Sequence, residues 1–438
     1  MQPTTQDVGV KTLLGYALPA FPFSFPLIPF AVFLPVFYAE DMGLGYLPVG
    51  VALFVARIVD VLSDPVAGYL SDFRPIRGSH RKSWIAIGAL IAGFALVMIT
   101  RVEPGVSAIH LGVWSAVLYI GWTLVTVPYL SLGAELAPSY EAKTSFTTAR
   151  EAVSLIGMLA ALSVPFFLEE GEPVIPAIPV VLVPVGLLCL GVFFLLIAEP
   201  KTNPDTTAFR KSHFSDVLTK TRFPKLGLIW FITSAASTVP AVLFPIYVEQ
   251  TLAGTELEQN LSILIYFVAA VFGMPFWLWF AKGRLKHQVM ALSTTIVCLT
   301  FPFAILLGPG DAFLFYGICI ITGFALAAEL SLAPSMLADV AELDQAITGE
   351  YRTGIHFSLW GMISKIALAV ATLLALGSME FVTAAVPETE RGLYVALLYA
   401  GLPALLKVPV VFLLKRFPFD DTDRDLIRAQ IRKKIAIT

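Results

Sequence analysis

The chain has 438 residues, of which 57% are hydrophobic and only 14% are charged. An ordinary soluble domain carries about 25% charged residues, so this chain has too few charges to cover a water-facing surface. The composition excludes a soluble enzyme and a disordered chain, and the net charge of −3 without a basic stripe argues against nucleic acid as a partner. We therefore expect an all-α membrane protein, because helices satisfy their own backbone hydrogen bonds in lipid.

Twelve apolar runs are long enough to cross a bilayer, which takes about 20 residues per helix. The longest polar stretch between them, residues 199–225, lies near the middle and leaves six runs on either side. Two six-helix bundles joined by a polar linker indicate an internally duplicated transporter. We expect a first bundle at 1–198, the linker at 199–225, a second bundle at 226–415 and a tail at 416–438. The predicted spans are residues 12–38, 46–71, 83–100, 107–133, 146–168, 174–198, 226–250, 260–281, 288–307, 312–337, 353–379 and 392–415.

The Lys and Arg residues are distributed unevenly between the two sets of loops. All but five of the 29 lie in one set of alternate loops, in the N-terminal segment and in the tail. The positive-inside rule then places both termini in the cytoplasm, and the acidic outer loop at 169–172 agrees with this orientation. We expect a monomeric, multi-pass protein of the cell membrane, which in a bacterium is the inner membrane. The five exceptions are Arg57, Arg101, Lys365, Arg391 and Lys407.

The first predicted span contains five prolines. Because proline removes a backbone donor and clashes with the preceding turn, an unbroken helix cannot form there. We expect a kinked helix, which suits alternating access when it lies near the bilayer midplane. The structural alternative is that membrane helices simply tolerate proline. The prolines are Pro19, Pro22, Pro26, Pro29 and Pro35.

The second predicted span carries three ionisable residues, Arg57, Asp60 and Asp64. Each costs at least about 2.5–3.5 kcal/mol at mid-bilayer, so each needs a partner or a water-filled cavity. Their spacing places them on one helical face, which Gly68 and Asp72 continue toward the cytoplasm. Two carboxylates one turn apart suit Na+ or an exchangeable proton. The alternative is an Arg57–Asp60 pair that fastens two helices, for which the second acid is surplus.

Two later spans also carry buried charge. Lys365 lies about a dozen residues from either end of its span, too deep to reach the surface easily. Its natural partners are the acids of the second span, either as a movable counter-charge or in a fixed salt bridge. Glu329 either faces the cavity as a substrate or proton ligand or is a neutral acid bonded to a neighbouring hydroxyl. Lys407, near the inner end of the last span, is close enough to extend its amine toward the surface, so its position favours a structural role over a transport role.

The remaining candidates are aromatic. Trp122, Tyr129 and Trp360 offer faces for stacking on a ligand, although such residues more often pack or face lipid. The chain contains no phosphate-binding loop, zinc-ligand pair or nucleophile elbow. We therefore expect a protein that is not an enzyme and that needs no cofactor beyond a coupling ion, Na+ or H+.

Several stretches carry a resemblance to a known family. They are the first apolar run ending in AEDMGL, RIVDVLSDPVAGYLSDFRPIRGSHRKSW at 57–84, VPYLSLGAELAPSYEAKTSFTTARE at 127–151, and PSMLADVAELDQAITGEYRTGIHFSLWGMISKIALA at 334–369. The chain resembles the melibiose-carrier branch of the major facilitator superfamily. This branch is the glycoside–pentoside–hexuronide:cation symporter family, which also contains the vertebrate lysolipid importers. The resemblance covers all twelve spans and implies the major facilitator fold.

The resemblance implies roles for the charged residues of the second span and the loop after it. Asp60 and Asp64 match the cation-site acids of the family, and Arg57 matches the Arg before them. A further set resembles the cytoplasmic loop that controls opening between the two halves. Its members are Gly68, Asp72, Arg77, Arg81 and Lys82.

The resemblance also places substrate residues, with departures. Lys365 matches the Lys that links the cation and sugar sites, Arg150 matches an Arg of the substrate cavity, and Trp122 replaces a cavity Tyr. Two family acids are replaced by hydroxyl residues, of which Thr126 offers a hydroxyl ligand to the cation, and two family Trp residues are replaced by Leu. The replacements are Ser24, Thr126, Leu130 and Leu330.

A galactoside site built on acids and stacking faces is therefore largely absent. A neutral disaccharide would leave many hydroxyls unpaired in so apolar a pocket. We expect cation-coupled symport, by alternating access, of an anionic or amphipathic organic solute near Arg150, Lys365, Trp122 and Glu329. The alternatives are a transporter of lysolipids or fatty-acid-like molecules and a membrane receptor that does not transport.

Overall fold

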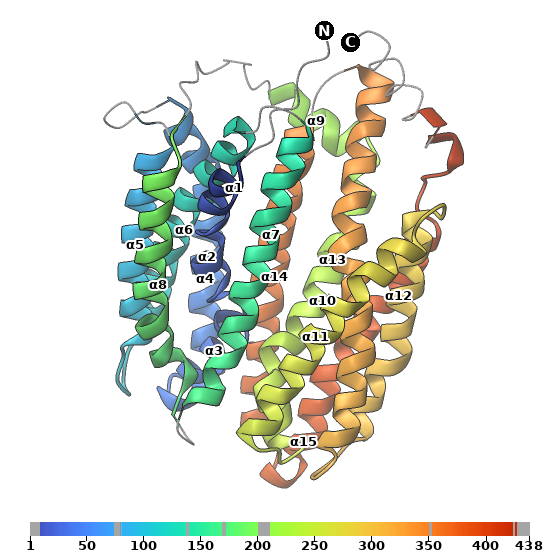
Figure 1. Cartoon of the computed structure of the whole chain (residues 1–438). Coiled ribbons are helices and arrows are strands. Elements are labelled where there is room, and N and C mark those ends of the chain that lie inside the picture. Colours follow the sequence, from blue (N-terminus) through green and yellow to red (C-terminus); the bar gives the residue numbers. More distant parts are fainter. Residues whose placement is uncertain are drawn as a thin grey trace, which may run out of the picture. The chain divides into compact units, whose positions relative to one another are not determined.

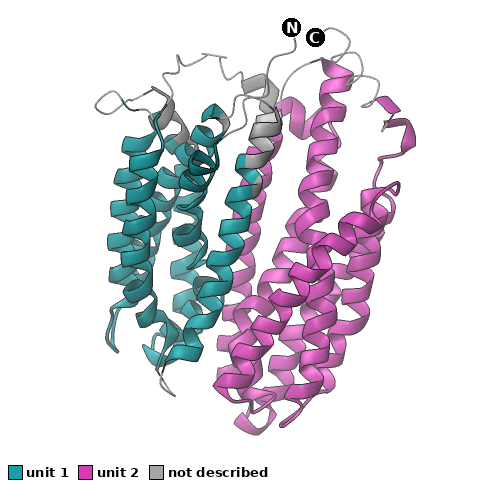
Figure 2. Ribbon diagram, viewed as in Figure 1, with its two compact units in different colours: residues 1–206 teal, residues 207–438 magenta. Residues whose placement is uncertain are grey.

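The computed structural model describes residues 9–73, 79, 81–136, 140–168, 172–199, 211–349, 353–423 and 425–426. Within these ranges, twelve helical segments are long and apolar enough to cross a membrane, which confirms the predicted all-α membrane protein with twelve spans. The chain divides into two compact units, residues 1–206 and 207–438 (Figures 1 and 2). Each unit contains six of the spans.

In the first unit, the proline-rich first span consists of four short pieces, which confirms the predicted kinks. The breaks fall at Leu18–Pro19 and Phe25–Pro26, where proline interrupts the backbone hydrogen bonding. A π-helical turn, with its wider hydrogen-bond spacing, ends the span. The pieces are α1 (Val10–Ala17), α2 (Ala20–Ser24), α3 (Leu27–Val36) and η1 (Phe37–Asp41).

The other five spans of the first unit are long helices. α4 and α5 both pack on α6. A Cβ on Gly88 of α5 would come within 2.7 Å of the Gly121 carbonyl oxygen of α6, so these two helices approach closely because both residues lack a side chain. The helices are α4 (Tyr46–Phe73), α5 (Lys82–Thr100), α6 (Ala108–Leu136), α7 (Tyr140–Ser163) with the 3-10 turn η2 (Val164–Phe167), and α8 (Val174–Leu196).

The second unit differs from the prediction mainly at span ends. The predicted linker 199–225 contains helix α9, and α10 already begins at Phe223 within it. The tenth span continues to Thr348, beyond its predicted end at 337, and stops at Gly349, whose φ of 74° suits glycine. The elements are α9 (Lys211–Lys220), α10 (Phe223–Gln250), α11 (Glu256–Phe280), α12 (Lys286–Thr300), η3 (Phe301–Leu306), α13 (Ala312–Thr348), α14 (Thr353–Ala385), α15 (Glu388–Ala396), η4 (Leu397–Gly401) and α16 (Leu402–Lys415).

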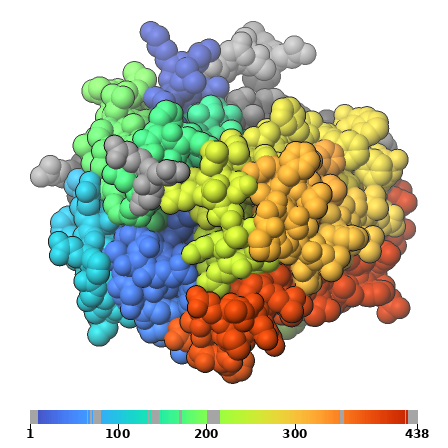
Figure 3. Space-filling view, turned by 90° about the horizontal axis from the view of Figure 1, so that it is seen from below, coloured from blue at the N-terminus to red at the C-terminus, as the bar shows by residue number. Residues whose placement is uncertain are grey.

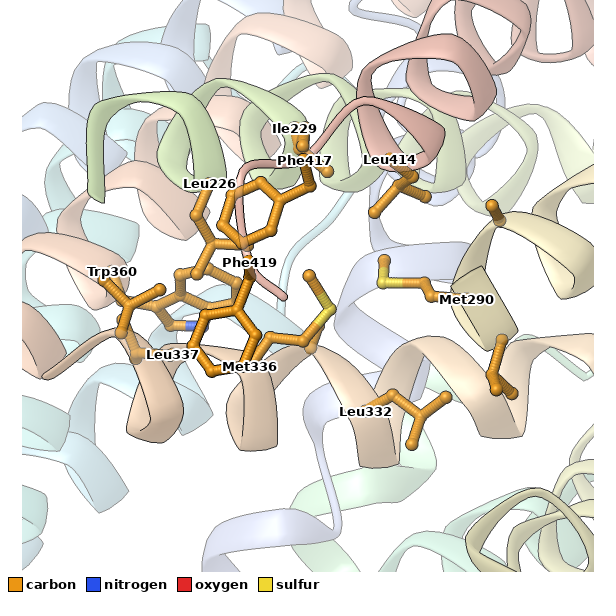
Figure 4. Packing of buried hydrophobic residues seen from close by; sticks show 14 of the residues in the cluster. Leu226, Ile229, Met290, Leu332, Met336, Leu337, Trp360, Leu414, Phe417 and Phe419 are labelled. Carbon is orange, nitrogen blue, oxygen red and sulfur yellow. The ribbon is translucent and has the colours of Figure 1, made fainter. Parts of the chain in front are cut away.

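A hydrophobic cluster of the second unit also holds the start of the tail. Leu226, Met336 and Trp360 pack together in it, and Phe417 and Phe419 insert from the segment after α16 (Figure 4). The predicted tail therefore begins as part of the second unit. Figure 3 shows the molecule from below, from the end at which Figure 1 labels α3 and α15. Within each unit, the side chains of neighbouring spans pack closely at this end.

Candidate cation and substrate sites

The charged residues of the second span meet a hydroxyl from α6. Arg57 Nη1 lies 2.9 Å from Asp60 Oδ2. The Thr123 hydroxyl lies 3.3 Å from Asp60 Oδ1 and 3.1 Å from Asp64 Oδ1. Asp60 and Thr123 are buried, at 4% and 1% exposure. Three side-chain oxygens from two helices thus converge inside the first unit.

The local sequence explains this convergence. The three- and four-residue spacing puts Asp60 and Asp64 on one face of α4, and α4 packs along α6 (Figure 1). Ser63 adds a further hydroxyl, which donates to the Asp60 carbonyl at 2.8 Å and lies 3.3 Å from Thr123 Oγ1. Carboxylate and hydroxyl oxygens are the ligands that hard cations prefer, and two neighbouring acids can instead share a proton.

The hydroxyl predicted for this site was Thr126, and the structure brings Thr123 there instead. The two residues lie almost one turn apart on α6. Hydropathy could not choose between them, because α6 is apolar on all sides and its rotation about its axis is not encoded in a polar stripe. The signal that was present is a hydroxyl residue in the middle of an apolar span.

Arg57 has a second neighbour besides Asp60. Its Cζ lies 4.1 Å from the centroid of the Tyr119 ring, one turn before Thr123 on α6. The Arg57 side chain is 21% exposed. The sequence pattern gave no role to Tyr119.

The predicted gating residues are only partly described. Arg81 donates to Glu135 Oε1 from Nε at 3.0 Å and from Nη2 at 2.7 Å. Its backbone N–H donates to Glu199 Oε1 at 2.7 Å, and Lys82 Nζ caps α8 through the carbonyls of Phe194 and Ile197. The start of α5 is thereby tied to α6 and α8 within the first unit. Gly68 and Asp72 lie on α4, but their surroundings, and Arg77 altogether, fall outside the described residues.

Two predicted substrate residues of the first unit have packing roles in the structure. Ser24 is buried and donates to the Ser154 carbonyl at 2.7 Å, which ties α2 to α7. The Tyr129 ring stacks on Tyr16, with centroids 4.7 Å apart. Each of these phenols also donates to the other residue's carbonyl, Tyr129 to Tyr16 at 2.7 Å and Tyr16 to Tyr129 at 3.2 Å. These contacts occupy the polar groups that a solute would need.

Two other predicted substrate residues of the first unit, Arg150 and Trp122, are partly exposed. Arg150, on α7, pairs with Glu151 and is 20% exposed. Trp122 packs edge-on against Phe23 and lines an apolar cavity of about 390 Å³ that is open on one side, where the exposed side chains of Leu90, Phe94 and Leu187 border it. Pieces of α2, α5, α6 and α8 form its walls, and every lining residue is apolar or glycine.

In the second unit, Glu329 of α13 forms an ion pair with Lys407 of α16. Both are buried, at 3% and 5% exposure, so the Lys407 amine does not extend to the surface and instead joins α16 to α13. Ser237 of α10 also donates toward Glu329 Oε2 at 3.3 Å, so Glu329 has a hydroxyl neighbour, but it is paired with a cation and is not the neutral acid of the sequence alternative. This ion pair compensates the Glu329 charge inside the unit, and the buried Glu329 carboxylate is not exposed to a solute.

Lys365 lies half-buried on α14. The preceding residue, Ser364, accepts a hydrogen bond from Trp230 Nε1 at 2.6 Å, and the Trp230 ring stacks on Trp360 with centroids 4.4 Å apart. The pairing of Lys365 with Asp60 and Asp64 joins different units and stays a prediction.

The described residues form twelve spans in two units of six, which is the arrangement of a multi-pass membrane protein with the major facilitator fold. The chain belongs to the MFS/sugar transport protein family, whose sequence profile matches residues 15–421. This confirms the resemblance recognised in the sequence. It is also consistent with a protein that is not an enzyme.

Individual relatives are distant but cover nearly the whole chain. The "Uncharacterized symporter YjmB" of Bacillus subtilis (strain 168) is 22% identical over 94% of this chain and 92% of its own length. The "Sodium-dependent lysophosphatidylcholine symporter 1-A" of Danio rerio is 23% identical over 98% of this chain and 90% of its own. The crystal structure of the nucleoside transporter NupG has a TM-score of 0.67 at 14% identity, with 94% of this chain and 100% of that chain covered. At this low identity, the similarity to NupG shows that the two chains share a fold and shows nothing about the solute.

Proposed function

We propose that this protein is a cation-coupled symporter that carries an organic solute by alternating access. The observation that carries the proposal is the convergence of Asp60, Asp64 and Thr123 inside the first unit. Buried acids in a membrane span are costly, and one acid would suffice to pair with Arg57. The second acid and the shared hydroxyl are what a cation site requires.

The coupling ion is Na+ in our proposal, with H+ as the alternative. Three converging oxygens supply a first set of ligands for a hard cation. One relative is named as sodium-dependent, which supports the same choice. If the ion is H+, the two carboxylates share it and Thr123 donates to the acid that stays ionised.

For the solute we propose an anionic or amphipathic molecule. Arg150 supplies an accessible guanidinium in the first unit, and Lys365 supplies an amine in the second. Leu130 and Leu330 stand where sugar carriers have Trp, and both are 48% exposed. These positions present aliphatic surface, which cannot stack on a sugar ring and does not replace the hydration of its hydroxyls.

A lysolipid or fatty-acid-like solute is the second candidate. The apolar cavity beside Trp122 favours it, because a cavity without polar lining suits a hydrocarbon chain and little else. The name of the Danio rerio relative points the same way. The first candidate, an anionic or amphipathic solute, differs from a lysolipid because its apolar part can be short.

We also propose the cell membrane as the location, with both termini in the cytoplasm and a monomer as the working form. The Lys and Arg distribution supports the orientation. In this orientation the contacts of Arg81 with Glu135 and Glu199 lie at the cytoplasmic end of the first unit, where they hold the start of α5 in place.

A thermal-shift screen tests the proposal. Purified protein is heated with sugars, sulfonates, carboxylates and lysolipids, each with Na+ and with choline in its place, at two pH values. A ligand at about 100 times its Kd stabilises the folded state by about 2.7 kcal/mol, so binding is visible. We expect a shift that needs both the solute and the cation in the wild type, and loss of the cation effect in Asp64→Asn. A solute shift that ignores Na+ and pH would refute coupling.

A further inference from the structure

The guanidinium of Arg57 contacts two groups in the first unit. Nη1 lies 2.9 Å from Asp60 Oδ2, and Cζ lies over the Tyr119 ring, 4.1 Å from its centroid. Arg57 belongs to α4, and Tyr119 precedes Thr123 by one turn of α6. Both contacts form on a side chain that is only 21% exposed.

Arg57 and a coupling cation compete for one carboxylate. Asp60 presents Oδ2 to Arg57 and Oδ1 to the Thr123 hydroxyl. A Na+ ion or a proton that binds these acids neutralises part of the carboxylate charge that attracts the Arg57 guanidinium. A largely buried guanidinium without compensation is costly, so loading the site requires another contact for Arg57.

We propose that Tyr119 is a positioning residue, which holds Arg57 when a cation occupies the Asp60–Asp64 site and thereby sets the affinity for that cation. The inference rests on the proposed function, because it needs a cation at these acids. The negative face of an aromatic ring attracts a guanidinium, most strongly away from water. Tyr119 therefore offers Arg57 a partner that does not compete for the carboxylate.

The ring changes cation affinity only if it stabilises the loaded state more than the empty one. In the empty state, Asp60 already compensates Arg57, and the ring adds little. In the loaded state, the carboxylate charge is shared with the cation, and the ring is the contact that stays with Arg57. The difference between the two states is what the Tyr119 side chain contributes to cation binding.

Two substitutions separate the ring from the hydroxyl. Tyr119→Phe keeps the aromatic face, whereas Tyr119→Leu removes it. Na+ is titrated into the purified full-length protein at constant ionic strength, with choline as the replacement and the melting temperature as the readout. The series is repeated against pH without Na+. We expect Tyr119→Phe to match the wild type and Tyr119→Leu to need about threefold to tenfold more cation.

A double-mutant cycle with Arg57→Gln tests whether the effect runs through Arg57. In the Arg57→Gln background, Tyr119→Leu should leave the half-saturating cation concentration unchanged. A purely structural role for Tyr119 would lower the melting temperature in both backgrounds and shift the half-saturating concentration in neither. An equal shift of that concentration in both backgrounds would also refute the proposal.

A ring-electronics series covers the case in which Tyr119→Leu does not fold. Phenylalanine with one, two or three ring fluorines at position 119 keeps the shape and progressively weakens the negative ring face. The half-saturating cation concentration should rise with each fluorine. A flat series, with cation binding that Asp64→Asn abolishes, refutes the role of Tyr119 and leaves the proposed function standing. If Asp64→Asn binds the cation as well as the wild type does, the proposed function fails and this inference fails with it.

Discussion

Thr123 Oγ1 lies 3.1 Å from Asp64 Oδ1, so a hydroxyl of α6 meets a carboxylate of α4 within the first unit. The same hydroxyl lies 3.3 Å from Asp60 Oδ1. A hydroxyl has one proton and two lone pairs. Thr123 can therefore donate to an acid when the site is empty, and in our proposal it turns a lone pair toward the bound cation and so links the two helices.

Removal of this hydroxyl should weaken the cation site. We expect Thr123→Ala to raise the half-saturating cation concentration about tenfold, which corresponds to about 1.4 kcal/mol, because the loaded site loses one of its three oxygen ligands. Thr123→Ser should keep most of the affinity, since it keeps the hydroxyl. Cation-dependent melting of the purified protein measures both.

Thr126→Ala is the matched control for this prediction. It removes the same hydroxyl group from the same helix, almost one turn away. The hydrogen bonds to Asp60 and Asp64 described above come from Thr123 and not from Thr126. Its cation affinity should equal that of the wild type. A larger loss in Thr126→Ala than in Thr123→Ala would restore the original sequence assignment.

The Glu329–Lys407 pair should contribute to stability only as a pair. Glu329→Gln or Lys407→Met alone leaves one buried charge uncompensated, which typically costs about 3–5 kcal/mol. The double variant removes both charges and should recover most of that loss, because a well-packed neutral pair can replace a buried ion pair. Denaturation midpoints in detergent measure all three.

The double variant also separates structure from transport. If the pair only holds α13 to α16, solute uptake returns together with stability. A stable double variant that no longer transports would instead assign Glu329 to the transport chemistry. Additive losses of stability in the double variant would contradict the ion pair itself.

Tyr129 should affect stability and leave solute affinity alone. Its hydroxyl donates to the Tyr16 carbonyl inside the core of the first unit. Tyr129→Phe leaves that carbonyl without its donor, which costs about 1–3 kcal/mol. The melting temperature should fall while the half-saturating solute concentration stays constant. A changed solute affinity at unchanged stability would return Tyr129 to the binding site.

The apolar cavity distinguishes the two candidate solutes. Gly93 lines it, and a Cβ there meets no atom within 4 Å, so Gly93→Leu adds a side chain at the cavity wall without a clash at its Cβ. Gly191→Leu on α8 is the control, since it is equally open and does not line the cavity. If a long hydrocarbon chain binds there, Gly93→Leu should weaken lysolipid binding at least tenfold, and Gly191→Leu should not. Equal lysolipid binding by both variants would remove the cavity from the function.

The parts of the fold that depend on composition could be predicted from the sequence. A twenty-residue apolar run has few options in lipid, so the spans were predictable, and the prolines of the first span predicted its breaks. The linker was less predictable, because α9 owes its position to Val217, which packs into the core of the second unit. A few scattered apolar residues in a polar segment do not indicate which of them makes such a contact.

The site was predictable where the residues share one helix. Arg57, Asp60 and Asp64 lie on a common face by spacing alone, and the structure pairs the first two. Contacts between helices were not predictable, because both the core face and the lipid face of a span are apolar and neither fixes its rotation. For this reason the sequence indicates Thr126 whereas the structure places Thr123 beside the acids, and the sequence gives no sign that Glu329 pairs with Lys407, 78 residues away.

Uptake into proteoliposomes tests the central claim most directly. The solute that gives the largest cation-dependent shift is offered outside vesicles that carry an inward Na+ or proton gradient. We expect the wild type to accumulate it above the outside concentration, and Asp64→Asn to lose accumulation while it still exchanges solute across the membrane without a gradient. Asp64 is the sharper choice, because Asp60 also pairs with Arg57. Unchanged accumulation in both Asp60→Asn and Asp64→Asn would contradict the account.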